Sequence, residues 1–239
     1  MHPLVYRDAT AVRRLGVVGA GKIGTAIARA AVAGGYDVAI SGSGPAERIE
    51  LIVEVLAPGA HAVTTEEVVR HADLIVLAVP MHRFRELPHD LFAGKILVDA
   101  MNYWVEIDGI DKELATATRG TSAVVQEWFS SSRLVKSLNH LGYFKFGQAQ
   151  RIRGEPDRIA MAAAGNDPDA VATVMRLIDR LGFDAVNAGP LDAGAALQPN
   201  GPVFGVSHSA NELSILLQPE GVGSDLHSSA TGASDGGRR

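Results

Sequence analysis

Short aliphatic runs alternate along the first hundred residues with stretches in which apolar residues recur every three or four positions. The runs predict buried strands, and the clearest of them is Leu74–Val79. The recurring positions predict helices, two of which end at glycine-containing stops, Gly34-Gly35 and Pro58-Gly59. We therefore expect strands over residues 15–18, 37–40, 61–64, 74–79 and 95–99, and helices around residues 23–33, 49–56, 65–69 and 84–92.

The hydrophobic pattern predicts further elements in the second half of the chain. Helical patterns cover residues 110–117 and 121–129, and a longer helix opens at Pro168 with an apolar stripe that reaches Leu181. Strands are expected over residues 133–138, 159–164 and 183–186. Strands that alternate with helices are typical of parallel βαβ units. The pattern predicts an α/β protein with a Rossmann-type doubly wound parallel sheet and a smaller α+β C-terminal part.

Composition narrows the possible classes of protein. Hydrophobic residues make up 46% of the chain and aromatic residues only 5%, so the core is aliphatic, as a helix-covered parallel sheet requires. A net charge of −5 gives no reason to expect nucleic acid, and no apolar run is long enough to cross a membrane. The chain has no cysteine, which excludes disulfides, thiolate metal sites and a cysteine nucleophile. We expect a cytoplasmic protein without a metal site.

A glycine-rich loop, Gly19-Ala20-Gly21-Lys22-Ile23-Gly24, joins the first predicted strand to the first predicted helix. In that context Gly19 permits a tight turn, Gly21 lets the backbone approach a diphosphate, and Gly24 lets the helix pack closely on the strand. A plain turn without a ligand is the alternative. The loop favours a dinucleotide-binding domain over residues 1–130, followed by a smaller part, 131–218, that closes the substrate cleft. The Gly-, Ser-, Asp- and Arg-rich residues 219–239 are expected to form a disordered tail.

The end of the second predicted strand favours NADP(H) over NAD(H). An NAD enzyme usually has an acidic residue there, whereas this chain has Ser41 and Ser43, with Arg48 a few residues on. Hydroxyls and a guanidinium can hold a 2′-phosphate that a carboxylate would repel. The alternative for Arg48 is a solvated helix residue, and the nearby Glu47 and Glu50 weaken the case.

The catalytic chemistry is less well marked. The chain has no Tyr-x-x-x-Lys pair, and His82 and His140 are the histidines expected at the carboxyl edge of the sheet. His140 is the candidate for the catalytic centre, although a lone histidine is more often structural. Hydride transfer between two stacked rings needs positioning more than acid–base groups, and would explain this pattern.

Five segments in the same order resemble the coenzyme F420-dependent NADP oxidoreductases, which use a deazaflavin hydride carrier. These segments are the glycine loop and residues 72–80, 98–104, 134–142 and 184–191, and the likeness spans about residues 15–206. The family often has arginine directly after the loop serine, where this chain has Gly44. This departure weakens the case for a phosphate contact in the loop. The stretches 101–104 and 198–202 indicate a divergent side branch whose hydride acceptor can differ from F420.

The resemblance implies reversible hydride exchange between NADPH and a deazaflavin that lies in the cleft between the two parts. It places Ser43 and Arg48 at the 2′-phosphate and Ala78, Val79 and Pro80 beside the nicotinamide. The residues implied near the ring stack are Asn102, Asn139, His140 and Leu141, with Asn139 and His140 as catalytic candidates. Tyr103 and Trp104 either stack on a ring or pack within the fold.

Two other functions stay open at this point. One is an NADPH-dependent reductase of a small carbonyl or imine, and the other is a non-catalytic NADP(H)-sensing protein. Small-molecule cofactors are the expected partners, and a homo-oligomer is expected by analogy with similar enzymes.

Overall fold

The computed structural model describes residues 12–218, and its central feature is one eight-stranded sheet in the order β3-β2-β1-β4-β5-β6-β7-β8. Neighbouring strands are parallel except β6 and β7, which are antiparallel. The α/β Rossmann-type fold predicted from the sequence is confirmed. The expected tail, 219–239, lies outside the described residues. The strands are β1 (Arg14–Val18), β2 (Asp37–Ser41), β3 (His61–Ala62), β4 (Leu74–Leu77), β5 (Ile96–Asp99), β6 (Arg133–Ser137), β7 (Ala160–Gly165) and β8 (Asp184–Gly189).

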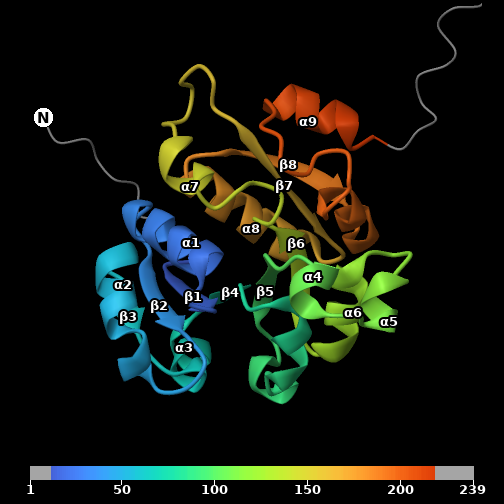
Figure 1. Cartoon of the computed structure of the whole chain (residues 1–239). Coiled ribbons are helices and arrows are strands. Elements are labelled where there is room, and N and C mark those ends of the chain that lie inside the picture. Colours follow the sequence, from blue (N-terminus) through green and yellow to red (C-terminus); the bar gives the residue numbers. More distant parts are fainter. Residues whose placement is uncertain (1–11, 219–239) are drawn as a thin grey trace, which may run out of the picture.

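Helices cover both faces of the sheet (Figure 1). The longest are α1 and α8, which pack on one face, while α3 and α6 pack on the other. The α-helices are α1 (Lys22–Ala33), α2 (Glu50–Leu56), α3 (Thr65–His71), α4 (Val105–Asp108), α5 (Lys112–Ala115), α6 (Thr121–Trp128), α7 (Lys145–Gln148), α8 (Pro168–Arg180) and α9 (Ala210–Leu216). The 3-10 helices are η1 (Ala46–Arg48), η2 (Met81–Glu86), η3 (His89–Phe92) and η4 (Leu191–Leu197).

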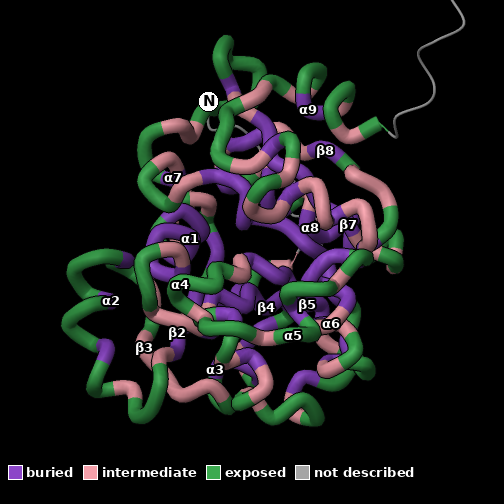
Figure 2. Tube along the Cα trace, turned by 45° about the vertical axis from the view of Figure 1, so that its right-hand side comes forward, coloured by how far each residue is buried: buried purple, intermediate pink, exposed green. Residues whose placement is uncertain are grey.

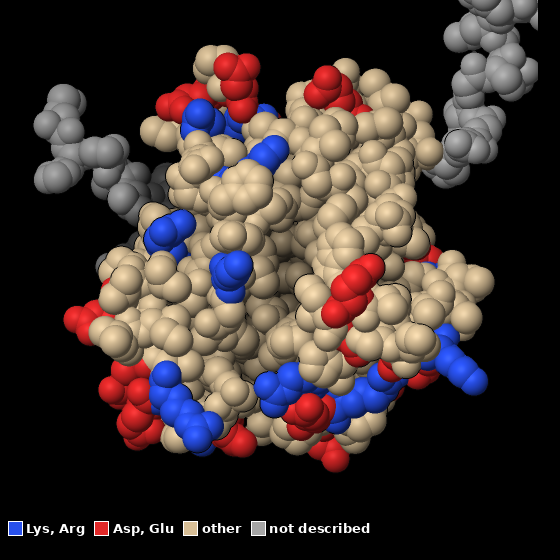
Figure 3. Space-filling model, viewed as in Figure 1, with Lys and Arg blue, Asp and Glu red and all other residues tan. Residues whose placement is uncertain are grey.

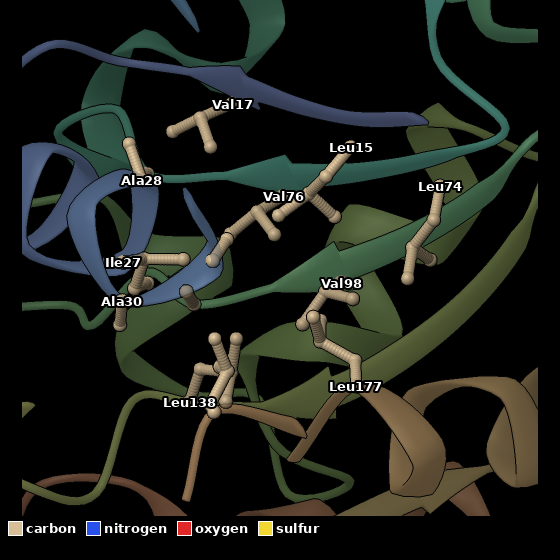
Figure 4. Packing of buried hydrophobic residues seen from close by; sticks show 14 of the residues in the cluster. Leu15, Val17, Ile27, Ala28, Ala30, Leu74, Val76, Val98, Leu138 and Leu177 are labelled. Carbon is tan, nitrogen blue, oxygen red and sulfur yellow. The ribbon is translucent and has the colours of Figure 1, made fainter. Parts of the chain in front are cut away.

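The core follows directly from the aliphatic strands. Leu74, Ile75, Val76 and Leu77 of β4 are all fully buried, because this strand lies in the middle of the sheet with helices on both sides. Figure 2 shows buried residues along the strands and mostly exposed ones on α2 and on the loops. On one face the side chains of β1, β4 and β5 pack against the small residues of α1 and against Leu177 of α8 (Figure 4).

Several predicted boundaries were wrong. The strand expected over residues 61–64 is limited to two residues, and the one expected over 74–79 ends at Leu77, so that Ala78–Pro80 form a loop. The helix expected over 84–92 is two 3-10 helices, η2 and η3, separated by Pro88, whose ring cannot donate a backbone hydrogen bond.

The C-terminal strands continue the sheet of the N-terminal ones. β6 pairs in parallel with β5, and β7 and β8 follow it across the antiparallel step. A smaller cluster of buried residues, which includes Val186, Leu197 and Leu213, fixes η4 and α9 against β7 and β8. The proposed division at residue 130 stays a prediction. No helix among residues 12–218 has the length and apolar character to cross a membrane.

Candidate functional site

The glycine loop lies between the end of β1 and the start of α1, and two of its glycines have no room for a side chain. Gly19 has a φ of +121°, and a Cβ there would lie 2.4 Å from the carbonyl oxygen of Ala78. A Cβ on Gly24 would lie 1.8 Å from the carbonyl oxygen of Gly19. Both close approaches are to backbone atoms, which cannot move aside, so each position requires glycine.

Gly21 differs from the other two glycines because a Cβ there would meet nothing within 4 Å. It is the N-cap of α1, no side chain caps this end of the helix, and no acidic residue lies in its first turn. The first N–H groups of a helix lack partners within the helix and carry a partial positive charge. The open backbone at Gly21 and the uncapped helix therefore fit a diphosphate group.

A cavity of about 260 Å³ lies beside this loop. It brings together six of the predicted cofactor residues from three loops: Gly19, Gly21, Ser43, Ala78, Val79 and Pro80. Among the wall residues that were not predicted, Thr65, Arg83, Glu86 and Leu87 come from α3 and from η2 with the residue after it. Their positions depend on how α3 and η2 pack beside the loop, which the local sequence pattern does not show.

Two predicted phosphate contacts are not in the cavity wall. Ser41 is fully buried, its Oγ lies 3.1 Å from Thr65 Oγ1, and its carbonyl accepts a hydrogen bond from Gly19 N (2.8 Å). This serine ties the end of β2 to the glycine loop and does not present its hydroxyl to the cavity. Arg48 lies exposed on η1, with its guanidinium beside Gly44.

The other loop residues have different surroundings. Lys22, the first residue of α1, is exposed, and its amine lies 5.6 Å from the ring centre of Tyr143. Ile23 is half-buried and packs against the core. The contact between Lys22 and Tyr143 brings the segment before α7 next to the start of α1. Figure 3 shows the surface hollowed between the side that carries α1 and the side that carries α4.

The two predicted asparagines meet at the carboxyl ends of β5 and β6. Asn139 Nδ2 donates to Asn102 Oδ1 (3.0 Å) and to the carbonyl of Leu197 (2.6 Å), and Asn102 Nδ2 donates to the carbonyl of Asn139 (2.9 Å). Leu138, just before Asn139, adopts a φ of +61°, which a branched residue rarely does. Such strain is found at sites where the surrounding structure fixes an unusual backbone.

A buried ion pair holds the turn that carries Asn102. Lys136 and Asp99 face each other on β6 and β5, both fully buried, with Nζ 3.4 Å from Oδ2. Lys136 Nζ donates to the carbonyl of Met101, and Asp99 accepts hydrogen bonds from Met101 N (3.0 Å) and Ser122 Oγ (2.7 Å). Both hydrogen-bonding groups of the Met101 backbone are thereby fixed. Sequence patterns gave no sign of this cluster because both residues lie in predicted core strands.

His140 and Leu141 lie in the interior. His140 is 1% exposed, and burial lowers its pKa to about 4, with His208 and Lys136 acting in the same direction. The imidazole is therefore neutral at physiological pH and does not face the cavity. The expectation that His140 acts as a catalytic group receives no support from this position. Leu141 is buried in the core formed with α1 and α8.

Tyr103 and Trp104, adjacent in sequence, have different surroundings. Tyr103 packs within the fold, since its hydroxyl donates to the carbonyl of Gly109 (2.8 Å) and accepts from Asp111 N (3.0 Å). Trp104 stays 39% exposed and meets Phe204 edge to face, with ring centres 5.7 Å apart. Tyr143 and Phe144 are also exposed. Aromatic surface is thus available near the start of α1.

Comparison with known proteins agrees with this geometry. Residues 14–103 match the family model described as "NADP oxidoreductase coenzyme F420-dependent", which covers the glycine loop and the strands around it. The resemblance inferred from the sequence is confirmed over this part of the chain. This segment is similar to the corresponding part of NAD(P)-dependent oxidoreductases. A search of curated proteins gives no match.

Solved structures share the fold at low sequence identity. A hypothetical protein, SMa0349, from Sinorhizobium meliloti is 23% identical with a TM-score of 0.71, over 85% of this chain and 98% of that one. A proposed F420-dependent NADP-reductase from Arthrobacter sp. FB24 is 24% identical with a TM-score of 0.64, over 77% and 88% of the two chains. An imine reductase from Myxococcus stipitatus is 18% identical with a TM-score of 0.52, over 77% of this chain and 57% of that one.

Proposed function

We propose that the protein transfers a hydride between NADPH and a deazaflavin such as coenzyme F420, or a similar flavin-like acceptor. The observation that carries the proposal is the open, uncapped start of α1 at Gly21, within a segment that matches the F420-dependent family. The Arthrobacter protein of similar fold is described as a reductase of this kind, which adds support.

The residues present fit a bound dinucleotide. The N–H groups of Lys22, Ile23 and Gly24 would meet its diphosphate, and Ala78, Val79 and Pro80 would border its nicotinamide half. When bound, NADP(H) supplies or accepts the hydride. The loop Ala78–Pro80 is held by the hydrogen bond from Ala78 N to Val18 O (2.8 Å), so its position is fixed before a ligand arrives.

The chain's contribution to hydride transfer is positioning. The buried pair Lys136–Asp99 fixes Met101, and the reciprocal bonds between Asn102 and Asn139 join the ends of β5 and β6. Rigid neighbouring loops at one sheet edge can hold two rings at the separation of about 3–3.5 Å that the reaction needs. Exposed Trp104 and Tyr143 offer flat surfaces for the second ring.

The test is anaerobic oxidation of NADPH by the purified protein, followed by absorbance with and without coenzyme F420. Loss of NADPH that depends on F420, and that falls sharply in the Gly21→Asp variant, is the expected result, since a carboxylate there would repel the diphosphate. Tight NADPH binding without turnover on F420 or flavins would contradict the proposed reaction. A panel of carbonyls and imines would then test the reductase alternative, and inactivity on all of them would favour the sensor.

A further inference from the structure

The cavity beside the glycine loop contains one pair of opposite charges that the dinucleotide contacts described above do not use. Arg83 and Glu86, both on η2, line its wall together with Gly42 and Ser43 from the loop after β2. Among the described residues that line this cavity, Arg83 is the only lysine or arginine. Arg48 and Lys22 are not part of the wall.

The part of the cavity lined by Gly42 and Ser43 corresponds to the adenosine half of a dinucleotide. In Rossmann folds the diphosphate lies at the glycine loop and the adenosine ribose lies at the end of the second strand, about 20 residues on. Here the end of β2 is Ser41, so Gly42 and Ser43 are next to the ribose position. This loop provides no carboxylate for the ribose hydroxyls, and Gly44 follows Ser43 without a cationic side chain.

The ion pair of Arg83 is suited to exchange. Arg83 Nε and Nη2 both donate to the same oxygen, Glu86 Oε2, at 2.9 and 2.6 Å. The two side chains are 40% and 58% exposed, and such surface pairs contribute little to stability. A phosphate monoester carries a larger negative charge than a carboxylate, and its oxygens accept paired guanidinium bonds. A 2′-phosphate can therefore replace Glu86 as the partner of Arg83 at small cost.

We propose that Arg83 determines specificity for NADP(H). It leaves Glu86 and binds the 2′-phosphate from η2, while Ser43 lines the same cavity from the loop after β2. The guanidinium thus comes from η2, after β4. It would bind the 2′-phosphate in place of an arginine directly after Ser43. The inference rests on the proposed function only for the presence of a dinucleotide, because it concerns nucleotide choice and not the hydride acceptor.

Direct binding measurements test this proposal without any turnover. Dissociation constants of NADPH and NADH are measured by nucleotide fluorescence for the wild type and for Arg83→Gln, Glu86→Gln and Arg85→Gln. Arg85 is a matched control, since it lies two residues away on η2, pairs with Asp111 and Glu113, and does not line the cavity.

Loss of one charged hydrogen-bonding partner should weaken NADPH binding by Arg83→Gln about 10- to 100-fold while NADH binding is unchanged. Glu86→Gln should bind NADPH several-fold more tightly, because Arg83 no longer has a competing partner, and Arg85→Gln should keep the wild-type ratio. If the wild type binds NADPH, the proposal would be overturned by an Arg83→Gln variant whose affinities for NADPH and NADH fall equally or do not change. If the wild type prefers NADH and Glu86→Gln abolishes that preference, Glu86 would instead be the acceptor for the ribose hydroxyls. Failure of the wild type to bind either nucleotide would overturn the proposed function as well.

Discussion

Three glycines of one loop have different physical reasons to be glycine. Gly19 and Gly24 are constrained by backbone atoms of the protein itself, and Gly21 is constrained by nothing within the protein. The sequence motif predicts a tight turn at Gly19, close helix packing at Gly24 and a diphosphate beside Gly21. The structure separates two positions that the fold requires from one that faces outward, where only a ligand would require a small residue.

This separation gives a prediction for two single variants. Gly24→Ala places a methyl group against the Gly19 carbonyl, and overpacking of this kind should lower the free energy of unfolding by about 1–3 kcal/mol or more. Gly21→Ala should leave the urea midpoint unchanged and weaken NADPH binding. Denaturation followed by circular dichroism, together with NADPH titration, checks both. Equal destabilisation by the two variants would show that the loop is not divided in this way.

The buried His140 predicts a dependence of stability on pH. Its pKa is about 4 in the folded protein, below the ordinary value of 6.5, mainly because burial disfavours the charged ring. The unfolded chain therefore binds more protons between these values, and stability falls as the pH drops from 6.5 towards 4. The contribution approaches about 1.4 kcal/mol per pH unit within this window.

Urea denaturation at several pH values measures this slope. His140→Gln, which has no titrating group, should show a smaller loss of stability between pH 6.5 and 4 than the wild type. Above pH 7 the difference in stability between the two proteins should no longer change with pH, because the His140 ring is neutral in both the folded and the unfolded chain. Parallel curves for the two proteins would mean that other groups account for the pH dependence.

At the scale of elements, the sequence predicted well where the signal is local. The predicted strands overlap all eight strands of the described residues, and the signal was clearest for β4 and β5, which are buried along their whole length. The ends of the strands were harder to predict. Val79 continues the apolar run of β4 but lies in the cavity wall, because the sheet ladder stops at Leu77. η4 and α9 lack long stripes and depend on contacts with β7 and β8.

The site was predictable to the extent that it consists of a motif. Glycine spacing indicated the loop, the end of the second strand indicated Ser43, and the family resemblance implied Val79. Arg83, Glu86 and Thr65 were missed because they come from elements whose distance from the loop is a property of the folded chain. Lys136 was missed for a related reason. A lysine in a predicted core strand gives no local sign that Asp99, on the neighbouring strand, is its partner.

Removal of one charge from the ion pair between β5 and β6 should destabilise the fold more than removal of both. Lys136→Met leaves Asp99 buried without its cation, and such a loss is expected to cost about 3–5 kcal/mol in unfolding free energy. Lys136→Met combined with Asp99→Asn removes both charges and should recover most of this loss. Urea denaturation of the wild type, the single variant and the double variant measures the effect. A double variant no more stable than the single one would contradict it.

At the scale of the whole molecule, one continuous sheet connects the part before residue 130 to the part after it. β5 and β6 pair across this boundary, and Lys136 and Asp99 link them further. The arrangement suggests that the two parts stabilise each other. A cleft between them would then be shaped by loops at one sheet edge rather than by movement of separate units.

The distribution of tryptophan allows a direct test. Both tryptophans, Trp104 and Trp128, lie before residue 130, whereas far-ultraviolet circular dichroism reports on helices throughout the chain. We predict that the urea transitions measured by tryptophan fluorescence and by circular dichroism coincide, because the shared sheet makes unfolding cooperative. Two separate midpoints would support independent domains divided near residue 130.

The reversed pairing of β7 with β6 also leaves a second edge of the sheet available for practical use. Because β7 runs against β6, its end at Gly165 and the residues before Arg133 share the edge opposite the glycine loop. The five residues of β6 separate the two edges by about 15 Å. Ser130 is exposed there, and the chain has no cysteine of its own. A single cysteine at this position would attach a dye or a solid support at one defined point and leave the opposite edge open to nucleotides.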